Sequence, residues 1–249
     1  MKLLEGKVAV VTGSATGIGQ EIAETFALYG ASLSLLDRKA EENRQVAESL
    51  RNRGSKVYDQ SLDLRDRKAI EDAMNRTADE FGTIDILVNN AGIYPRQEFL
   101  TMTEGQWDEM QQINLKSMFH TTQAALPKMI SNRSGKIVNI SSVTFHLGMA
   151  GLTHYVASKG GVIGFTRALA REVGMHNIHV NCITPGAVLV EAEKAVVSEE
   201  QAKAWVAQQC LQRRILPIDI ARVCLFLSSE LSDGLTGQTL NVDGGWVMH

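Results

Sequence analysis

Short apolar runs alternate with longer segments of helical periodicity over most of the chain. The apolar runs fall at residues 8–11, 32–36, 56–58, 84–88, 136–140 and 179–183, and the helical segments at 17–29, 40–53, 66–81, 105–131, 155–174 and 217–229. Strands that are buried on both faces read as continuous apolar runs, and helices between them indicate parallel crossovers. The alternation therefore predicts an α/β fold with a doubly wound parallel sheet and helices on both faces.

The 249 residues show no internal repeat, low-complexity tract or Pro/Gly/Ser linker. A chain of this length can bury one large core, so we expect residues 1–249 to form a single domain. One long stretch breaks the strand-helix rhythm. It covers residues 187–216, follows Thr184-Pro185-Gly186, and contains a helix-like segment at 199–209 with Trp205. We interpret residues 187–216 as a mobile substrate lid.

Charge and cysteine content narrow the class of partner and the compartment. Lys and Arg number 25 against 28 Asp and Glu, which leaves a net charge of −3 and no bulk attraction to nucleic acid or to an anionic membrane. The three cysteines have neither zinc-site nor disulfide-framework spacing. No run has the length of a signal-peptide core or of a membrane span. We expect a soluble cytoplasmic protein with a small neutral or weakly charged partner.

A glycine-rich loop follows the first apolar run and opens the first helix. Its sequence is Thr-Gly-Ser-Ala-Thr-Gly-Ile-Gly at residues 12–19. Glycines let the backbone turn tightly and approach a pyrophosphate, whose charge is stabilised by the N–H groups of the helix N-terminus. A turn that merely needs positive φ is the alternative, but the strand-loop-helix context favours a dinucleotide site. The candidate contacts are Gly13, Ser14, Thr16, Gly17, Ile18 and Gly19.

Asp37 ends the second apolar run about 20 residues beyond this loop. A carboxylate there can accept both hydroxyls of the adenosine ribose and repel a 2′-phosphate, which favours NAD over NADP. Arg38 follows directly and could bind a 2′-phosphate, so NADP remains possible. Asp37 could also simply cap the helix that starts near Ala40.

Tyr155 and Lys159 are four residues apart in a predicted helix, so their side chains lie on one face, one turn apart. A free phenol ionises near pH ~10, and using it near neutral pH requires lowering its pKa by about 3, or about 4 kcal/mol. A cation about 4 Å away at an effective dielectric near ~20 supplies on the order of 4 kcal/mol. We therefore expect Lys159 to prepare Tyr155 for proton transfer.

Several motifs occur along the chain in a characteristic order and spacing. They are Gly13-x-x-x-Gly17-Ile18-Gly19, Asn89-Asn90-Ala91-Gly92, Ser142, Tyr155-x-x-x-Lys159, Pro185-Gly186 and the segment 235–245. Over essentially its whole length the chain resembles the short-chain dehydrogenase/reductase family. The resemblance implies a single Rossmann domain with a seven-stranded parallel sheet in the order 3-2-1-4-5-6-7. It also implies a homotetramer.

The resemblance implies a catalytic set. Tyr155 resembles the acid/base that exchanges a proton with the substrate oxygen, and Lys159 the residue that lowers the pKa of the tyrosine and binds the nicotinamide ribose. Ser142 matches the donor that polarises the carbonyl or alkoxide. Asn114 matches the residue that holds a water in a proton relay to the lysine. Taken without these partners, Asn114 could equally be a polar residue that bends its helix.

The family pattern also implies cofactor contacts beyond the glycine loop. Asp63 and Leu64 resemble the pair that flanks adenine, and many relatives have a threonine at the position of Val190, so backbone contacts must orient the nicotinamide here. The remaining implied contacts are Asn90, Ala91, Gly92, Pro185, Gly186 and the backbone of Val188, together with Tyr155 and Lys159.

The substrate pocket is less well defined by the sequence. Its candidate residues are Tyr94, Ser142, Thr144, His146 and Tyr155, which could hold an aromatic alcohol, a cyclic alcohol or a sugar. The six histidines lack metal-site spacing, so we expect no metal. Trp246 near the C-terminus is a candidate for contact with a neighbouring subunit's pocket.

Three functions are compatible with these residues. The favoured one is an NAD-dependent oxidoreductase that transfers a hydride between the nicotinamide and a secondary alcohol, ketone or cyclic hemiacetal. An NADPH-dependent ketone reductase, favoured by Arg38, is the first alternative. The second is a dinucleotide-binding regulator without chemistry, which would have no need for Asn114, Ser142, Tyr155 and Lys159 together.

Overall fold

Seven parallel strands form one sheet in the order β3-β2-β1-β4-β5-β6-β7 in the computed structural model, which describes residues 2–194 and 197–248. This is the predicted architecture. The strands are β1 (Val8–Thr12), β2 (Ser32–Asp37), β3 (Val57–Ser61), β4 (Ile86–Asn89), β5 (Gly135–Ile140), β6 (Ile178–Pro185) and β7 (Thr239–Val242).

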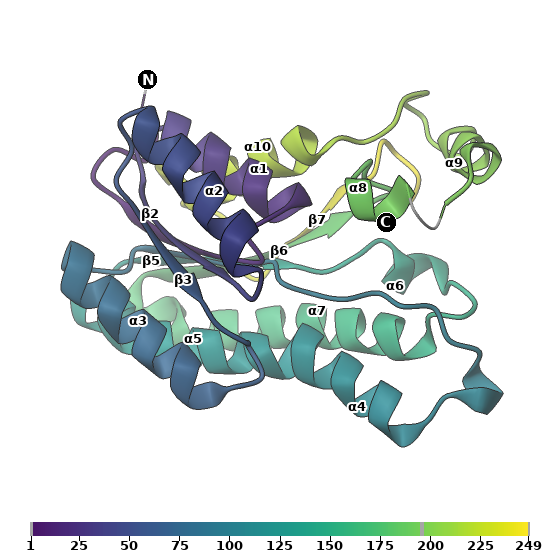
Figure 1. The fold of residues 1–249 in the computed structure, drawn as a ribbon, viewed down its shortest axis with the longest axis horizontal. Helices are drawn as coiled ribbons and strands as arrows, with labels where there is room; N and C mark the ends of the chain where they lie inside the picture. The colour runs from purple at the N-terminus through teal and green to yellow at the C-terminus, as the bar shows by residue number, and fades with distance from the viewer. Residues whose placement is uncertain (1, 195–196, 249) are drawn as a thin grey trace.

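Helices cover both faces of the sheet (Figure 1). One face carries α1 (Gly17–Leu28), α2 (Ala40–Asn52) and α10 (Pro217–Ser228), and the other carries α3 (Arg67–Phe81), α4 (Glu104–Gln111), α5 (Ser117–Asn132) and α7 (Thr153–Val173). The short helices are α6 (Thr144–Leu147), α8 (Glu191–Lys194), α9 (Glu199–Val206), and the 3-10 turns η1 (Phe99–Thr101), η3 (Gly174–His176) and η4 (Glu230–Ser232).

The two larger hydrophobic clusters of the described residues lie on opposite sides of the sheet. All five residues of β1 are buried, and they alternate between the cores: Ala9 and Val11 join one cluster, and Val10 joins the other. The first cluster packs against α1 and α10, where Phe26 is fully buried. Burial on both faces explains why the central strands appear as unbroken apolar runs in the sequence.

Strand β7 is an exception, because no apolar run predicts it. Its four residues are all half-buried, since it is the edge strand and pairs only with β6. Strand β4 is shorter than the apolar run at 84–88 and begins at Ile86. The side chain of Asp85, just before it, accepts the N–H of Val8 at 2.8 Å and so aligns β4 with β1.

The helix predicted over 105–131 is divided into three parts. Between α4 and α5 the backbone forms a π-helix, η2 (Gln112–Lys116), with Asn114 at its centre. Single-turn π segments are rare and are frequent at functional sites. Pro127 lies inside α5, where it removes one helical hydrogen bond.

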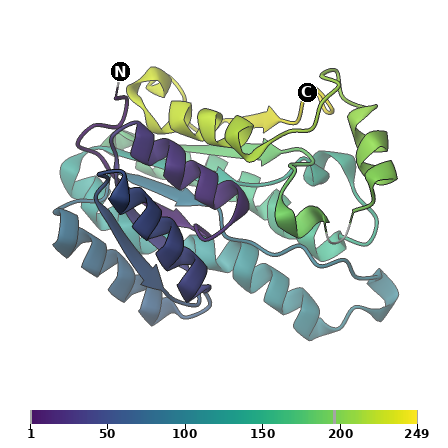
Figure 2. The same ribbon diagram turned by 45° about the horizontal axis from the view of Figure 1, so that its top comes forward.

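Residues 187–216 contain two short helices, and residues 195–196 lie outside the described part. Helix α9 starts with a capping box of Ser198 and Gln201. It ends at Val206, earlier than the predicted 209, because the N–H groups of Gln208 and Gln209 bond to carbonyls only three residues back. Figure 2 shows α9 on the same side of the molecule as the C-terminus. Within the described residues, no helix has both the length and the apolar character needed to cross a membrane.

Candidate active site

The candidate site lies at the carboxyl ends of the strands, where the sheet order reverses between β1 and β4. Ligands of doubly wound sheets bind at this point. Thr12 at the end of β1 accepts the N–H groups of Asn90 and Ala91 at 3.0 and 3.1 Å, and its own hydroxyl donates to the Val88 carbonyl at 3.2 Å. These bonds hold the two strand ends together. Sequence reasoning did not assign Thr12 a role, although it is the first residue of the glycine-rich loop.

The glycine loop has the shape of a phosphate cradle. Gly13 and Gly17 have φ of +67° and +61°, which disfavours other residues. A Cβ on Gly19 would lie 2.0 Å from the Gly13 carbonyl oxygen, so the loop folds directly onto the start of α1. Thr16 is the N-cap of α1, but within the described residues its hydroxyl caps no N–H group. The first turn of α1 is thus available to a phosphate, and the loop fits a dinucleotide.

The loop residues have different environments. Ser14 is fully buried and its hydroxyl donates to Asn43 Oδ1 at 2.7 Å, so only its backbone faces a ligand. The half-buried Ile18 packs against the core beside α1. The side chain of Val190, in place of the family's threonine, comes within 3.3 Å of the Cβ position of Gly17. Val190 and Ile18 pack against the same hydrophobic cluster, and Val190 limits the space beside Gly17.

The carboxylate of Asp37 accepts two backbone N–H groups, one in the glycine loop and one at the start of α2. Its Oδ2 accepts the N–H of Ala15 in the glycine loop at 3.0 Å, and its Oδ1 accepts the N–H of Lys39, the N-cap of α2, at 2.9 Å. The carboxylate is therefore held at the end of β2 beside the loop. Arg38 is exposed next to it.

Asp63 and Leu64, the pair predicted to flank adenine, both contact other residues of the protein. Arg65 bonds to the carboxylate of Asp63 and holds its pKa below the usual value. Leu64 belongs to the core beside α3. On the other side of the crevice, Asn90 Nδ2 donates to the carbonyls of Thr12 and Gly13 at 2.9 and 3.1 Å.

The predicted nicotinamide segment is fixed through its backbone. The Pro185 carbonyl accepts the N–H of Val143 at 3.0 Å, and the N–H of Gly186 donates to the Val242 carbonyl at 3.0 Å. The N–H of Val188 donates to the Gly186 carbonyl, and Val188 forms a parallel bridge with Ile215. The two ends of the lid segment therefore meet beside the nicotinamide position.

Helix α7 places Tyr155 and Lys159 on one face, as their spacing predicts. The Lys159 Nζ atom lies 5.6 Å from the centre of the Tyr155 ring. The lysine is only 4% exposed, and its ammonium donates to the Ile140 carbonyl at 2.9 Å. In return, the hydroxyl of Ser141 donates to the Lys159 carbonyl at 2.8 Å. Both bonds join α7 to the end of β5, and neither was evident from the sequence.

The structure does not support the expectation that Lys159 lowers the pKa of Tyr155. Burial raises the pKa of Tyr155 to about 12, and a hydrogen bond from Ser142 opposes this only in part. Burial also lowers the pKa of Lys159 to about 8. The ammonium is committed to Ile140 and lies beside the ring, so desolvation outweighs its attraction for a phenolate. In this state Tyr155 is a proton donor at neutral pH.

Ser142 follows β5 and is 7% exposed. Its Oγ accepts the backbone N–H of Thr144 at 3.2 Å and the hydroxyl of Thr144 at 2.9 Å. Ser142, Tyr155 and Lys159 are thus brought together by the end of β5 and the first turns of α7.

Asn114 lies in the π-helix behind these residues. It pairs with the backbone of Ile93, accepting its N–H at 2.8 Å and donating to its carbonyl at 2.9 Å. The Cβ position of Gly92 is within 3.2 Å of Asn114 Oδ1 and 3.5 Å of Lys159 Nζ, so the three residues are neighbours. A cavity of about 10 Å³, about the space of one water, adjoins Asn114 and is lined by polar groups that include Asn89 and Thr121. The water relay stays a prediction.

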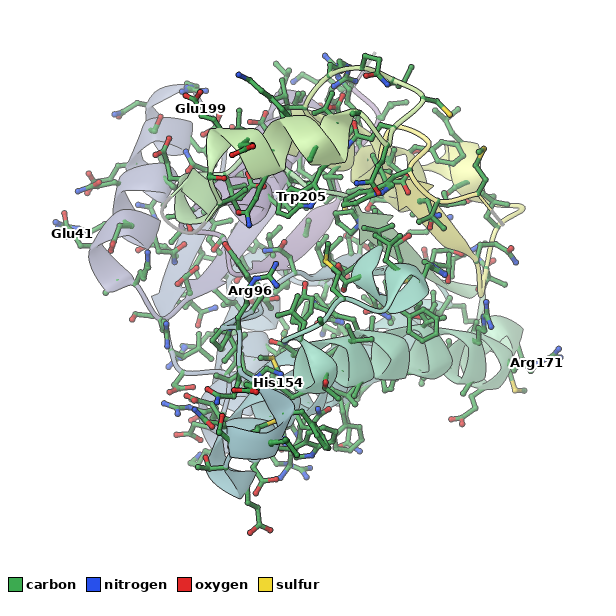
Figure 3. The ribbon with its side chains drawn as sticks, turned by 90° about the vertical axis from the view of Figure 1, so that its right-hand side faces the viewer. Glu41, Arg96, His154, Arg171, Glu199 and Trp205 are labelled. Atoms are coloured by element: carbon green, nitrogen blue, oxygen red, sulfur yellow. The ribbon has the colours of Figure 1, made fainter. Side chains whose placement is uncertain are left out.

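Tyr94, one of the candidate substrate residues, contacts Tyr155. The rings of Tyr94 and Tyr155 meet edge to face with centres 6.4 Å apart. His146 packs edge to face on Phe145 at 5.2 Å. In Figure 3, Arg96 lies between Trp205 of the lid and His154 at the start of α7.

Residues of the 187–216 segment, interpreted from the sequence as a lid, contact other parts of the same chain. Arg214 forms an ion pair with the buried Glu193 of α8 and also donates to the Ala187 carbonyl at 3.4 Å. Trp246 lies against Trp205, with ring centres 6.2 Å apart, and donates to Gln208 at 3.3 Å. The tail considered for a neighbouring subunit therefore contacts the lid of the same subunit. Across residues 2–194 and 197–248, no group of three potential metal-binding side chains occurs.

Comparison with known proteins identifies the family. A family model described as enoyl-(acyl carrier protein) reductase matches residues 13–247. The 3-oxoacyl-(acyl-carrier-protein) reductase FabG of Chlamydia pneumoniae is 40% identical over 243 residues, covering 97% of each chain. The 2-dehydro-3-deoxy-D-gluconate 5-dehydrogenase of Escherichia coli K12 is 39% identical over 98% of this chain and 96% of its own.

A solved structure agrees with these relatives. A 7α-hydroxysteroid dehydrogenase, complexed with NADH and 7-oxo glycochenodeoxycholic acid, superposes with a TM-score of 0.96 and 33% identity over 100% of this chain and 97% of its own. The chain belongs to the short-chain dehydrogenase/reductase family, and it is an oxidoreductase that acts on hydroxyl or keto groups.

The glycine loop supplies the first testable prediction. The Gly19→Ala variant should weaken NADH binding by at least about tenfold, because the new Cβ would displace the Gly13 carbonyl and open the cradle. Fluorescence titration with NADH measures the dissociation constant. Gly164→Ala is the matched control, since nothing lies within 4 Å of its Cβ position in α7. Equal binding by both variants would contradict the cradle.

Proposed function

We propose that this protein is an NAD-dependent dehydrogenase/reductase that transfers a hydride between the nicotinamide and a secondary alcohol, ketone or cyclic hemiacetal of a small molecule. One observation carries the proposal: Tyr155 and Lys159 share a face of α7 at the sheet's carboxyl edge, beside the hydroxyl of Ser142. A regulator without chemistry would need none of these three groups in contact.

The proposed cofactor residues divide between phosphate, ribose and nicotinamide. The loop at Gly13–Gly19 would hold the pyrophosphate, and Asp37 the adenosine ribose. The segment at Pro185–Val188 would contact the nicotinamide, and Lys159 its ribose. NAD is favoured because the Asp37 carboxylate is fixed beside the loop, where a 2′-phosphate would meet like charge. The NADH bound to the 7α-hydroxysteroid dehydrogenase supports the same choice.

The proposed chemistry in the reductive direction starts from a protonated Tyr155. The bound nicotinamide supplies the hydride to the carbonyl carbon, or accepts it in the reverse direction. Tyr155 donates its proton to the substrate oxygen, and Ser142 donates a hydrogen bond to the same oxygen as charge develops. The ammonium of Lys159 stabilises the phenolate that remains. Alcohol oxidation reverses each step.

The proposal also covers the oligomeric state and the cellular compartment. Trp107, Phe119 and Ile130 are large apolar residues exposed on α4 and α5, which a homotetramer could cover. Cys182, Cys210 and Cys224 are all free thiols among the described residues, which fits a reducing compartment such as the cytoplasm. Arg38 keeps an NADPH-dependent ketone reductase as the second candidate.

Tyr155→Phe tests the acid role. The variant should lower kcat by about 10³-fold, because the hydroxyl that exchanges the proton is gone, while the dissociation constant for NADH stays within about threefold. Turnover is followed by nicotinamide absorbance with a panel of sugars, polyols, cyclic alcohols and aryl alcohols and the matching ketones. Tyr58→Phe on β3 is the control. Loss of NADH binding by Tyr155→Phe would instead make the tyrosine structural.

The pH dependence of ketone reduction tests the role of Lys159. The pKa of Lys159 is about 8 and that of Tyr155 about 12, so below pH 8 both groups carry their protons. Above pH 8 the ammonium that stabilises the phenolate is lost, and kcat should fall by up to tenfold per pH unit. Initial rates from pH 6 to 10, with circular dichroism to confirm folding, provide the profile. A flat profile between pH 8 and 10 argues against this role.

Cofactor choice is tested at Asp37. Wild type should show a kcat/KM at least about tenfold higher with NADH than with NADPH, because the carboxylate repels a 2′-phosphate. Asp37→Asn should reduce this ratio mainly by improving NADPH. Asp59→Asn on the neighbouring strand, whose carboxylate pairs with Arg51, is the matched control. A preference of wild type for NADPH would favour the alternative based on Arg38.

A further inference from the structure

The Ser142 hydroxyl has an unusually complete set of acceptor bonds. Its oxygen accepts the N–H of Thr144 at 3.2 Å and the hydroxyl hydrogen of Thr144 at 2.9 Å. A serine hydroxyl has two acceptor lone pairs and one donor hydrogen. Both lone pairs are therefore used by a single residue two positions along the chain, and the hydrogen is left for a different partner.

The local backbone explains why Thr144 can make both bonds. Thr144 is the first residue of α6, so its N–H has no carbonyl of a preceding turn to bond. The preceding N–H, that of Val143, is already donated to the Pro185 carbonyl at 3.0 Å. The chain is thus anchored at Val143 and turns back at Thr144 so that its backbone and side chain both meet Ser142.

We propose that Thr144 is a positioning residue that holds the Ser142 hydroxyl as a hydrogen-bond donor toward the reacting oxygen. The inference rests on the proposed function and assigns Thr144 a role different from substrate contact. With its lone pairs occupied, Ser142 cannot accept the proton of Tyr155, so both hydroxyls converge on the substrate oxygen as donors.

This arrangement predicts a specific catalytic cost when the Thr144 hydroxyl is removed. Without it, one lone pair of Ser142 is free to accept from the Tyr155 phenol, which diverts the proton from the substrate. The defect should appear in kcat, because the donor acts on charge that develops in the transition state, and not in the binding of NADH or ketone.

The experiment compares T144V, which keeps the β-branched shape, with T144S, which keeps the hydroxyl. T144V should lower kcat for ketone reduction about tenfold, with KM and the NADH dissociation constant within about twofold of wild type. T144S should stay within about threefold of wild type in kcat. The substrate is whichever ketone of the panel the wild-type protein reduces.

A double-mutant cycle separates positioning from general damage. Because Thr144 acts through Ser142, adding T144V to S142A should lower kcat by less than about twofold, although T144V alone lowers it about tenfold. The inference is overturned if T144V leaves kcat unchanged, if T144S fails to restore it, or if T144V costs the same in the S142A background. Absence of turnover by wild type would overturn the proposed function itself, and with it this inference.

Discussion

The ammonium of Lys159 is the contact on which the arrangement of the site depends. It is almost completely buried, and burial of an unpaired charge is strongly unfavourable. The Ile140 carbonyl at the end of β5 meets this need, and Ser141 bonds back to the Lys159 carbonyl. These two bonds hold the position of helix α7 along β5. That position also decides where Tyr155, one turn earlier, meets Ser142.

Burial gives these groups their chemical character. In water a phenol and an ammonium both carry protons at neutral pH. Tyr155 and Lys159 do so here as well, but the pKa of Lys159 lies much closer to neutral pH. Desolvation moves the pKa of Tyr155 up to about 12 and that of Lys159 down to about 8. The protein thus keeps the tyrosine as an acid while the lysine charge stays sensitive to its surroundings. A cofactor ribose or a polar substrate oxygen bound nearby would therefore affect the charge of Lys159.

A second set of contacts joins the cofactor crevice to the lid. Thr12 and Asn90 tie the ends of β1 and β4 under the glycine loop. Val190 packs against the same hydrophobic cluster as Ile18 of the loop, and Arg214 bonds to both the Ala187 carbonyl and Glu193. The residues proposed to hold the phosphate and the nicotinamide are therefore connected by contacts to the 187–216 segment, whose two ends meet at Val188 and Ile215.

Local sequence features determined the class of fold and indicated the residues of the candidate site. The apolar runs marked six strands, the glycine loop marked the crevice, and the four-residue spacing of Tyr155 and Lys159 put them on one face. Such features follow from backbone periodicity and steric limits, which act over a few residues. The seventh strand came only with the family resemblance, since the half-exposed β7 has no continuous apolar run.

Only the tertiary structure decided what depends on distant neighbours. The reversal of the expected pKa of Tyr155 arises from burial by other elements, and the partner of Lys159 is a backbone carbonyl that no side-chain motif records. The contacts of Asn114 in the π-helix likewise depend on a distant segment, because its side chain bonds to the backbone of Ile93. Periodicity places side chains on a face, whereas desolvation and hydrogen-bond direction are set by what packs against that face.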